Sequence, residues 1–327
     1  MAPSRDMDNR TFHQDPTSLY NLPNDLPEHS RLDEQAKHVS TIMDHRILHA
    51  PLNPNKPNTR ILDIGTGTGY VADTLALQNR SAQVYGLDLS PVPPRSGRTP
   101  NVHFVRGNIS NQPPSKWTPL PDAETKTEFS DSSSDSGASN PDYTDSVGAG
   151  GPLFPRDEET FDLLFSRFLV AGISDWDAFI EKEYHLLKRG GWAEIHDLDA
   201  TVYNAADEPI SNRADWQVLP ERAAEKAGLD FQCAWRAAER MRQAGFVDVV
   251  QKEYALPLGG EGERRPDMKA AGEFFAPTFA EVREMVIRRY VDAPERAEGM
   301  VRRMRETMMA PEAGRHYKLV VTYGRKP

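Results

Sequence analysis

Three glycines at alternate positions follow a short apolar run, and an aspartate precedes them. The motif reads Asp63-Ile64-Gly65-Thr66-Gly67-Thr68-Gly69, and a helical pattern begins directly after it. Glycine permits a tight turn and lets a ligand approach the backbone without a Cβ in the way. The helix that follows presents unpaired N–H groups and the positive end of its dipole. We therefore predict a small-molecule site at Asp63, Gly65, Gly67 and Gly69.

The spacing of the glycines separates two classes of ligand. Dinucleotide-binding enzymes carry G-x-G-x-x-G, and the helix N-terminus holds a pyrophosphate. Here the spacing is G-x-G-x-G, Tyr70 occupies the sixth position, and an acid comes first. A carboxylate beside the loop repels pyrophosphate but can hold an ammonium group, such as that of the methionine part of S-adenosylmethionine (SAM). The motif favours SAM over NAD.

Polar residues also follow the next two apolar runs. Asp88 ends VYGLD, where a carboxylate can accept hydrogen bonds from both ribose hydroxyls. Asn108 follows VHFVR, and its amide oxygen can accept a hydrogen bond from an adenine amino group. Each residue alone is compatible with a turn, a helix cap or a solvated charge. Together with the glycine motif, in this order, they indicate a nucleoside cofactor.

Candidate bases occur in His196-Asp197-Leu198-Asp199. The tetrad should end a strand, on the side of an open α/β sheet where ligands bind, and histidine titrates near neutrality. We predict that His196 and Asp197 are catalytic. The alternative is that His196 is a packed polar residue and the acids cap the next segment. A metal site at the same residues is less favoured, and we predict none.

The hydrophobic patterns alternate between strand and helix, as in parallel βαβ units. Seven strands are expected at 61–64, 83–87, 102–106, 161–165, 192–196, 247–256 and 317–323. Helices are expected at 31–49, 70–78, 176–187, 231–244, 278–290 and 294–309, with a further helix after residue 213 and a turn at 188–191.

Two polar segments interrupt this pattern. Residues 1–18 are expected to be a disordered tail, followed by one domain over 19–327. Residues 111–160 form an acidic, low-complexity insertion, and 123–151 are too poor in large apolar residues to offset their ordering entropy. We expect 123–151 to be disordered.

With these motifs the sequence resembles the class I SAM-dependent methyltransferases. Within them it is similar to the filamentous-fungal group of LaeA-type proteins and natural-product methyltransferases. The similarity is carried by six segments: YNLPNDLPEHSRLDEQ (20–35), ILDIGTGTGYVADTLA (61–76), GLDLSPVPP (86–94), FSRFLVAGISDW (165–176), LLKRGGWAEIHDLD (186–199) and VVTYGRKP (320–327).

The resemblance implies an α/β, Rossmann-like fold. Its seven-stranded, mostly parallel sheet has an antiparallel last strand and helices on both faces, and lid helices lie around 213–244 and 278–309. It also implies that Tyr20, Arg31, Ser166 and Arg167 lie near the cofactor. Asn108 stands where an acid is commoner in the family. The complete set of expected cofactor residues is Tyr20, Asp63, Gly65, Gly67, Gly69, Asp88, Leu89, Asn108, Ile109, Ser166 and Arg167.

Charge and composition restrict the partners. The net charge is −10, which argues against binding to nucleic acid or to anionic membranes. The single cysteine, Cys233, excludes an intramolecular disulfide, and the N-terminus lacks a signal-peptide apolar region. We expect a cytoplasmic SAM-dependent methyltransferase that acts on a small molecule in fungal secondary-metabolite biosynthesis. The alternative is a LaeA-like, SAM-binding regulator that acts through protein partners, in which case it would be nuclear.

Overall fold

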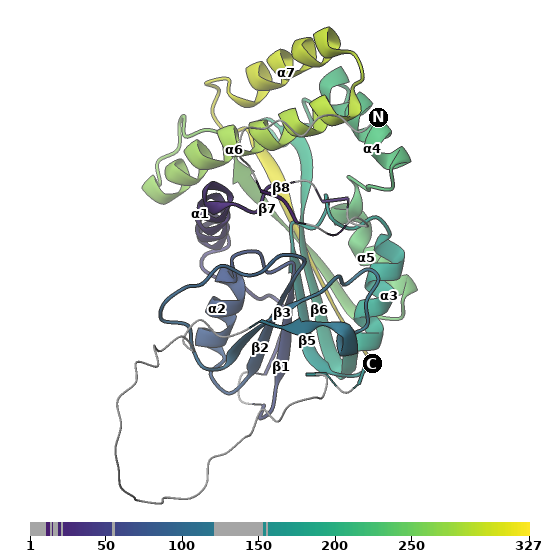
Figure 1. Ribbon diagram of the computed structural model, residues 1–327. Helices are drawn as coiled ribbons and strands as arrows, with labels where there is room; N and C mark the ends of the chain where they lie inside the picture. Colours follow the sequence, from purple (N-terminus) through teal and green to yellow (C-terminus); the bar gives the residue numbers. More distant parts are fainter. Residues whose placement is uncertain are drawn as a thin grey trace, which may run out of the picture.

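In the part of the chain that the structure describes, eight strands form a mixed sheet at the centre of the molecule (Figure 1). The computed structural model describes residues 11–13, 15, 19–20, 22–53, 56–120, 153–154 and 156–327. The strands are β1 (Arg60–Ile64), β2 (Gln83–Asp88), β3 (Val102–Arg106), β4 (Thr118–Pro119), β5 (Phe161–Arg167), β6 (Leu187–Tyr203), β7 (Val247–Pro257) and β8 (His316–Arg325). Their order in the sheet is β4-β3-β2-β1-β5-β6-β8-β7.

The predicted Rossmann-like fold is confirmed, with one more strand than expected. Strands β3, β2, β1, β5 and β6 are parallel, and β8 runs antiparallel to both β6 and β7. The additional strand is β4, two residues that pair with the end of β3 at the sheet edge. From β1 the chain runs outward through β2 and β3, then returns to the other side of β1 as β5. This reversal is the position at which open α/β sheets bind ligands.

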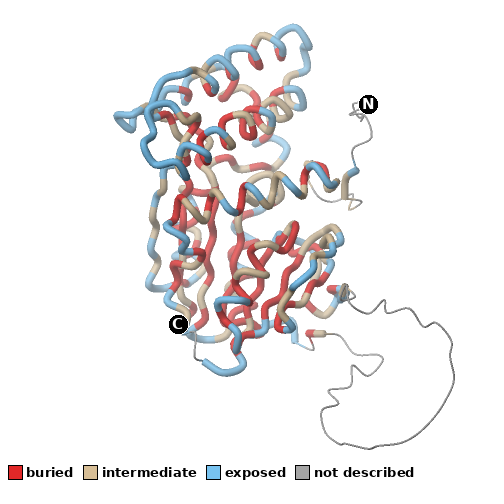
Figure 2. The backbone as a smooth tube through the Cα atoms, turned by 90° about the vertical axis from the view of Figure 1, so that its left-hand side faces the viewer, coloured by how far each residue is buried: buried red, intermediate tan, exposed pale blue. Residues whose placement is uncertain are grey.

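Within the described residues, seven α-helices surround the sheet. They are α1 (Leu26–Ile42), α2 (Tyr70–Gln78), α3 (Trp176–Leu186), α4 (Asp215–Lys226), α5 (Cys233–Gln243), α6 (Pro266–Tyr290) and α7 (Pro294–Met308), and a short 3₁₀ turn, η1, covers Pro114–Lys116. Successive strand residues point to opposite faces. Ile61 therefore packs in the cluster with α2, whereas Leu62 packs in the cluster with α3 and α5. Figure 2 shows the resulting buried strands between more exposed helices.

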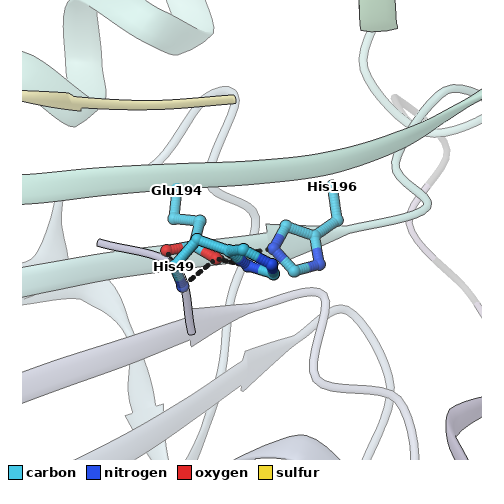
Figure 3. A group of neighbouring side chains, drawn as sticks. All are labelled: His49, Glu194 and His196. Atoms are coloured by element: carbon cyan, nitrogen blue, oxygen red, sulfur yellow. Dashed lines mark hydrogen bonds and ion pairs between the residues drawn. The ribbon is translucent and has the colours of Figure 1, made fainter. Parts of the chain in front are cut away.

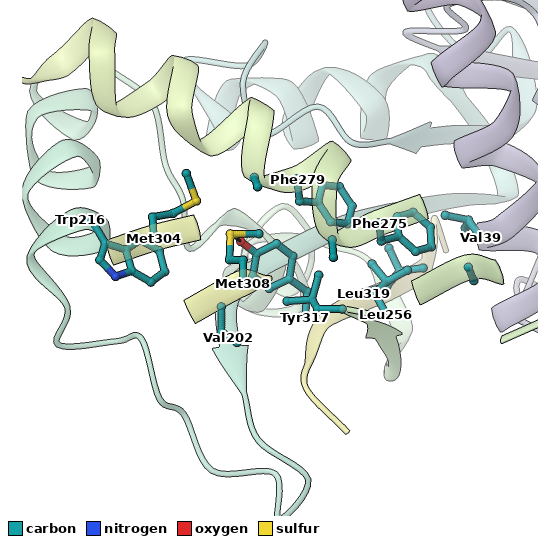
Figure 4. Packing of buried hydrophobic residues seen from close by; sticks show 14 of the residues in the cluster. Val39, Val202, Trp216, Leu256, Phe275, Phe279, Met304, Met308, Tyr317 and Leu319 are labelled. Carbon is teal, nitrogen blue, oxygen red and sulfur yellow. Dashed lines mark hydrogen bonds between the residues drawn. The ribbon is translucent and has the colours of Figure 1, made fainter. Parts of the chain in front are cut away.

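Helices α4, α6 and α7 form a layer beyond the ends of β6, β7 and β8 (Figure 1). Their apolar side chains join those of the strands in one continuous cluster, so this layer shares its core with the sheet (Figure 4). The cluster combines Phe275 and Phe279 of α6, Met304 of α7, and Tyr317 of β8. Because the layer buries its apolar face on the sheet, we infer that it folds together with the sheet.

Several predicted boundaries were wrong because of local signals. The first helix starts at Leu26 instead of residue 31, since Asp25 caps it by accepting from the Glu28 N–H, and it ends at Ile42 instead of residue 49. Helix α6 starts twelve residues before the predicted Thr278, at Pro266, because Pro277 lies inside the helix without ending it. The predicted turn at 188–191 belongs to β6, which also continues past His196 to Tyr203.

The two polar segments are only partly described. Residues 111–120 and 156–160 belong to the folded sheet region, where Trp117 and Phe154 are buried, so the insertion is shorter than 111–160. Residues 123–151, which were expected to be disordered, lie outside the described residues. Within the expected tail, residues 11–13 and 15 are placed against the domain; the Thr11 carbonyl accepts from the Asn24 N–H at 2.8 Å. Of the described helices, none has the length and hydrophobicity to cross a bilayer.

Glu183 of α3 is fully buried, and neither carboxylate oxygen has a hydrogen-bond partner in the part of the chain that the structure describes. Burial raises its pKa well above the usual value, so the folded protein holds this proton to a higher pH than the unfolded chain. Folding stability is therefore lost as the pH rises above about 4.5. We expect Glu183→Met to stabilise the protein by an amount that grows with pH, up to about 1.4 kcal/mol per pH unit.

Urea unfolding of both proteins between pH 5 and pH 8 measures this dependence. Glu181→Met, on the same helix but with an exposed side chain, is the matched control. An advantage of Glu183→Met that does not change with pH would contradict the prediction.

Candidate functional site

A cavity of about 390 Å³ lies beyond the carboxyl ends of β1, β2, β3 and β5. Its walls come from four strand ends and from the N-terminal part of the chain. The polar or charged lining residues from the strand ends include Asp63, Thr66, Thr68, Asp88, Ser90, Asn108, Ser110 and Arg167. This volume falls within the range of small-molecule sites, and the position agrees with the predicted ligand site.

The glycine motif forms the turn between β1 and α2. Gly65, Gly67 and Gly69 have φ angles of +70°, +56° and +80°, which residues with a Cβ rarely adopt. Gly65 and Gly67 line the cavity. Gly69 does not: it precedes the first residue of α2, and a Cβ there would lie 2.7 Å from the Phe104 ring. Gly69 thus lies outside the cavity lining, its close approach to Phe104 serves the packing of the turn, and its contact with the cofactor stays a prediction.

Asp63 and Arg167 place opposite charges at one end of the cavity. Burial raises the pKa of Asp63 to about 7, although the Thr66 hydroxyl, 2.6 Å from Oδ2, and the Arg167 charge both act to lower it. Burial also lowers the pKa of Arg167 to about 10, so the guanidinium stays charged at neutral pH. Among the described residues no hydrogen-bond partner of this guanidinium is found. The pair can therefore receive a ligand that carries both a positive and a negative group.

Asp88 lies at the end of β2 and is fixed by the neighbouring backbone. Its Oδ2 accepts from the Gly67 N–H at 2.8 Å, and its Oδ1 accepts from the Ser90 N–H at 2.9 Å. Burial raises the pKa of Asp88, while these N–H groups stabilise the charged form. The carboxylate thus links the glycine turn to the next strand and faces the cavity, as predicted for a ribose acceptor.

Asn108 lies after β3, at the opposite end of the cavity from Arg167. Its side chain accepts from the Ser110 N–H and donates to Asp15. Leu89 and Ile109, which follow Asp88 and Asn108 in the chain, also line the cavity. The adjacent strands therefore present an amide, a carboxylate, the glycine turn and a guanidinium in that order.

Residues of the N-terminal segment and of α1 cover the cavity; of these, only Tyr20 and Arg31 were expected near the cofactor from the sequence. Tyr20 lines the cavity together with His29, Leu32 and Gln35. Leu32 lies directly over the turn, since a Cβ on Gly67 would be 3.4 Å from its Cδ1. The sequence did carry a signal for this cover: His29, Leu32 and Ala36 are spaced so that they lie on one face of a helix.

Helix α1 is held on the glycine turn by Asp33. The Thr68 hydroxyl donates to Asp33 Oδ1 at 2.5 Å, and Arg95 binds the same carboxylate at 2.6 Å. Arg31 does not line the cavity; it pairs with Glu28 and donates to Gln35. No residue of α4 to α7 lines this cavity, and α5 packs on β6, β7 and β8. The helices expected as a lid, around 213–244 and 278–309, therefore do not cover the cavity. The cover comes instead from Leu19, Tyr20 and α1 as far as Ala36.

A family model described as a methyltransferase domain matches residues 35–251. The match covers the glycine turn, all the strand ends that form the cavity, and β6. The chain belongs to the methyltransferase-domain family. The predicted resemblance to SAM-dependent methyltransferases, and the prediction of an enzyme, are thus confirmed.

The methyltransferase is also similar to characterised fungal proteins. It is 27% identical to methyltransferase pytC of Aspergillus terreus over 83% of this chain and 71% of that protein. It is 24% identical to N-methyltransferase tcpN of Claviceps purpurea over 91% of this chain and 94% of that protein. The secondary metabolism regulator LAE1 of Cochliobolus heterostrophus is 25% identical over 76% of this chain and 69% of that protein.

His196 of the methyltransferase lies in the protein interior and does not line the cavity. Its Nε2 is 2.7 Å from Glu194 Oε1, and its ring packs against His49 and Phe165. Burial lowers the pKa of His196 despite the nearby Glu194 charge, so the ring is neutral at pH 7. The prediction that His196 is a general base at a strand end is corrected: β6 continues for seven more residues, which leaves His196 in mid-strand.

His49, Glu194 and His196 form a buried polar group (Figure 3). Their potential ligand atoms lie within 4.8 Å of one another, which is compatible with a metal ion. However, Glu194 already accepts from the His49 and Ala50 N–H groups as well as from both rings. Burial would raise the pKa of Glu194, yet these donors hold it at about 2. The geometry is that of a hydrogen-bonded network that fastens the segment before β1 to β6.

Asp197 and Ser166 do not line the cavity either. Asp197 Oδ2 accepts from the Leu169 N–H at 2.9 Å, and burial raises the pKa of this carboxyl to about 7. It therefore supports the 168–174 segment that lines the cavity, and the predicted catalytic role is corrected to a structural one. Ser166 is buried on the other face of β5 from Arg167, and its hydroxyl has no hydrogen-bond partner among the residues described.

We expect His196→Ala to lower the free energy of unfolding by about 2–4 kcal/mol, because it opens a cavity and removes a donor from the buried Glu194 carboxylate. SAM affinity and the rate per folded molecule should hardly change. His196→Gln keeps a donor and should recover part of the stability. Chemical denaturation and calorimetry measure the two effects; a hundredfold loss of rate at unchanged stability would restore His196 as a catalytic residue.

Proposed function

We propose that this methyltransferase binds SAM along the cavity and transfers its methyl group to a small molecule of fungal secondary metabolism. The observation that carries the proposal is the order of polar groups across adjacent strands. Asn108 matches adenine, Asp88 matches the ribose hydroxyls, and the glycine turn leads to Asp63 and Arg167. Adjacent strands are about 4.8 Å apart, so four strand ends span roughly 14 Å, which suits an extended nucleoside–amino acid ligand.

The charged end of the cavity supports SAM rather than a dinucleotide. A methionine moiety carries an ammonium and a carboxylate on one carbon. Asp63 would complement the ammonium, and the Arg167 guanidinium would complement the carboxylate through charge-assisted hydrogen bonds. A pyrophosphate would instead bring two negative charges beside the Asp63 carboxylate.

The chain contributes to methyl transfer mainly by enclosure and orientation. When bound, SAM supplies a methyl group made electrophilic by its sulfonium. Leu32, Phe168 and Leu169 provide apolar walls that exclude water, while the charges at one end and the Asn108 amide at the other fix the direction of the ligand. Holding an acceptor in line with the methyl group supplies much of the rate of such displacements.

The raised pKa of Asp63 predicts a pH dependence of binding. Below pH 7 the carboxyl takes up a proton in the free protein and no longer attracts an ammonium. We expect SAM affinity to fall by up to about tenfold per pH unit as the pH decreases from 7 to 5.5. Calorimetric titration measures this, and Asp63→Asn should bind weakly with a flat profile. A wild-type affinity that is constant over this range would contradict the role of Asp63.

Two measurements test the proposed function. Isothermal titration with SAM tests binding, and incubation with methyl-labelled SAM and a fungal metabolite extract tests transfer to a small molecule. Label in an extractable metabolite is the expected result. Failure of the folded protein to bind SAM would overturn the proposal.

The similarity to LAE1 supports a second candidate, a SAM-binding regulator that acts through protein partners. Deletion of the gene distinguishes the two. An enzyme predicts one pathway that stops at an unmethylated precursor, whereas a regulator predicts the loss of many metabolites at once. A cytoplasmic location, or a nuclear one for a regulator, stays a prediction that fluorescent tagging can test.

A further inference from the structure

The N-terminal residues reach the end of the cavity at which we propose that adenine binds. Asp15 Oδ2 lies 2.8 Å from the Nδ2 of Asn108, and Asp15 is half-buried. The same part of the chain is attached nearby through Asn24, whose Nδ2 donates to the Ser90 hydroxyl at 3.0 Å. Asp15 therefore contacts the polar side chain at this end of the cavity.

The partners of Asn108 determine which way its amide points. The two ends of a carboxamide are almost equal in shape but opposite in hydrogen bonding, because the oxygen accepts and the nitrogen donates. An ionised carboxylate only accepts, so the Nδ2 end must face Asp15. The Ser110 N–H only donates, so Oδ1 must face Ser110, 2.9 Å away. Without Asp15, one of the two constraints on this orientation is lost.

The orientation matters for the base that binds there. Adenine offers an amino donor at C6 beside ring-nitrogen acceptors, and a carboxamide can pair with such an edge through its oxygen and its nitrogen together. Hypoxanthine has a carbonyl oxygen at C6 and a protonated N1, so its pattern is reversed. A fixed carboxamide therefore distinguishes the two bases, whereas one that can flip accepts either.

We propose that Asp15 is a positioning residue for base specificity: it holds the Asn108 amide in the orientation that selects adenine. This inference rests on the proposed SAM function. Asp15 acts through Asn108 and needs no contact of its own with the ligand.

The test compares two ligands that differ only at the base, S-adenosylhomocysteine and S-inosylhomocysteine, by calorimetry on the full chain. We expect the wild type to prefer the adenosyl ligand by about tenfold to a hundredfold. Asp15→Ala should reduce this preference at least fivefold, chiefly by weakening adenosyl binding. Asp15→Asn, which can still offer an oxygen to Asn108, should give an intermediate preference.

Thr11→Val is the matched control, because it removes a side-chain contact of the same segment with Asn24, 2.8 Å long, and leaves Asn108 unchanged. It should preserve the preference between the two ligands. Melting temperatures confirm that each variant is folded.

Three results would overturn the inference while leaving the proposed function intact. They are an equal loss of affinity for both ligands in Asp15→Ala, no change in either affinity, and a wild type that binds both ligands equally. A folded wild type that binds neither ligand would overturn the proposed function itself.

Discussion

Gly67→Val should abolish measurable SAM binding, a loss of at least about a hundredfold, in a protein that still folds. Gly67 has a φ of +56°, and a Cβ there would lie 3.4 Å from Leu32, in the space between the glycine turn and α1. Valine is strained in this backbone region, and its two branches would extend further into the ligand's path. The turn would also shift its N–H away from Asp88.

Gly190→Val is the matched control for this variant. Gly190 has a φ of +77° and open space around its Cβ position, and it lies at the start of β6, away from the cavity. Both variants should lose stability through backbone strain, but only Gly67→Val should lose affinity. Calorimetry and thermal unfolding measure the two quantities, and retained affinity in a folded Gly67→Val would show that the turn does not hold the cofactor.

Asp88→Ala should lower SAM affinity by about two to four orders of magnitude. A hydrogen bond to a charged group contributes about 1.5–3 kcal/mol, and we propose that Asp88 accepts two from the ribose. The variant also leaves the Gly67 and Ser90 N–H groups without their acceptor. Asp88→Asn keeps one acceptor oxygen, so its loss should be smaller.

A ligand without ribose hydroxyls separates the direct effect of Asp88 from its effect on the turn. If the 2′,3′-dideoxy analogue of S-adenosylhomocysteine binds equally weakly to the wild type and to Asp88→Ala, the loss comes from the ribose contacts. A further large loss for this analogue in Asp88→Ala would assign the effect to the glycine turn. Unchanged affinity for SAM itself would contradict the ribose role.

Local patterns predicted the sheet and the strand ends well, because both depend on neighbouring residues. The glycine motif, Asp88 and Asn108 each follow a strand directly, so knowledge of a parallel sheet was sufficient to bring them to one edge. Arg167, which ends β5 and lines the cavity, was expected near the cofactor only from the family resemblance. Helix boundaries were less accurate, since Pro277 is tolerated within α6 by its tertiary packing.

The catalytic prediction failed for a reason that is not local. Whether His196 ends its strand depends on β8, which pairs with β6 as far as Tyr203 and is more than a hundred residues later in the sequence. The side chain then faces His49, a residue from the segment before β1, rather than the ligand. Likewise, the cover formed by α1 depends on Asp33 meeting Thr68 and Arg95, a contact that no short pattern indicates.

The hydrogen bonds that join His49, in the segment before β1, to Glu194 of β6 affect how the protein folds during synthesis. The backbone of His49 is held by Glu194, 145 residues later in the sequence, and β1 obtains its second neighbour only when β5 is made. Chains leave the ribosome N-terminus first, and closing long loops slows folding. The glycine turn therefore emerges early but stays on an incomplete sheet until β5 and β6 follow. Ribosome-bound chains that end before Glu194 should be sensitive to proteolysis and unable to bind cofactor.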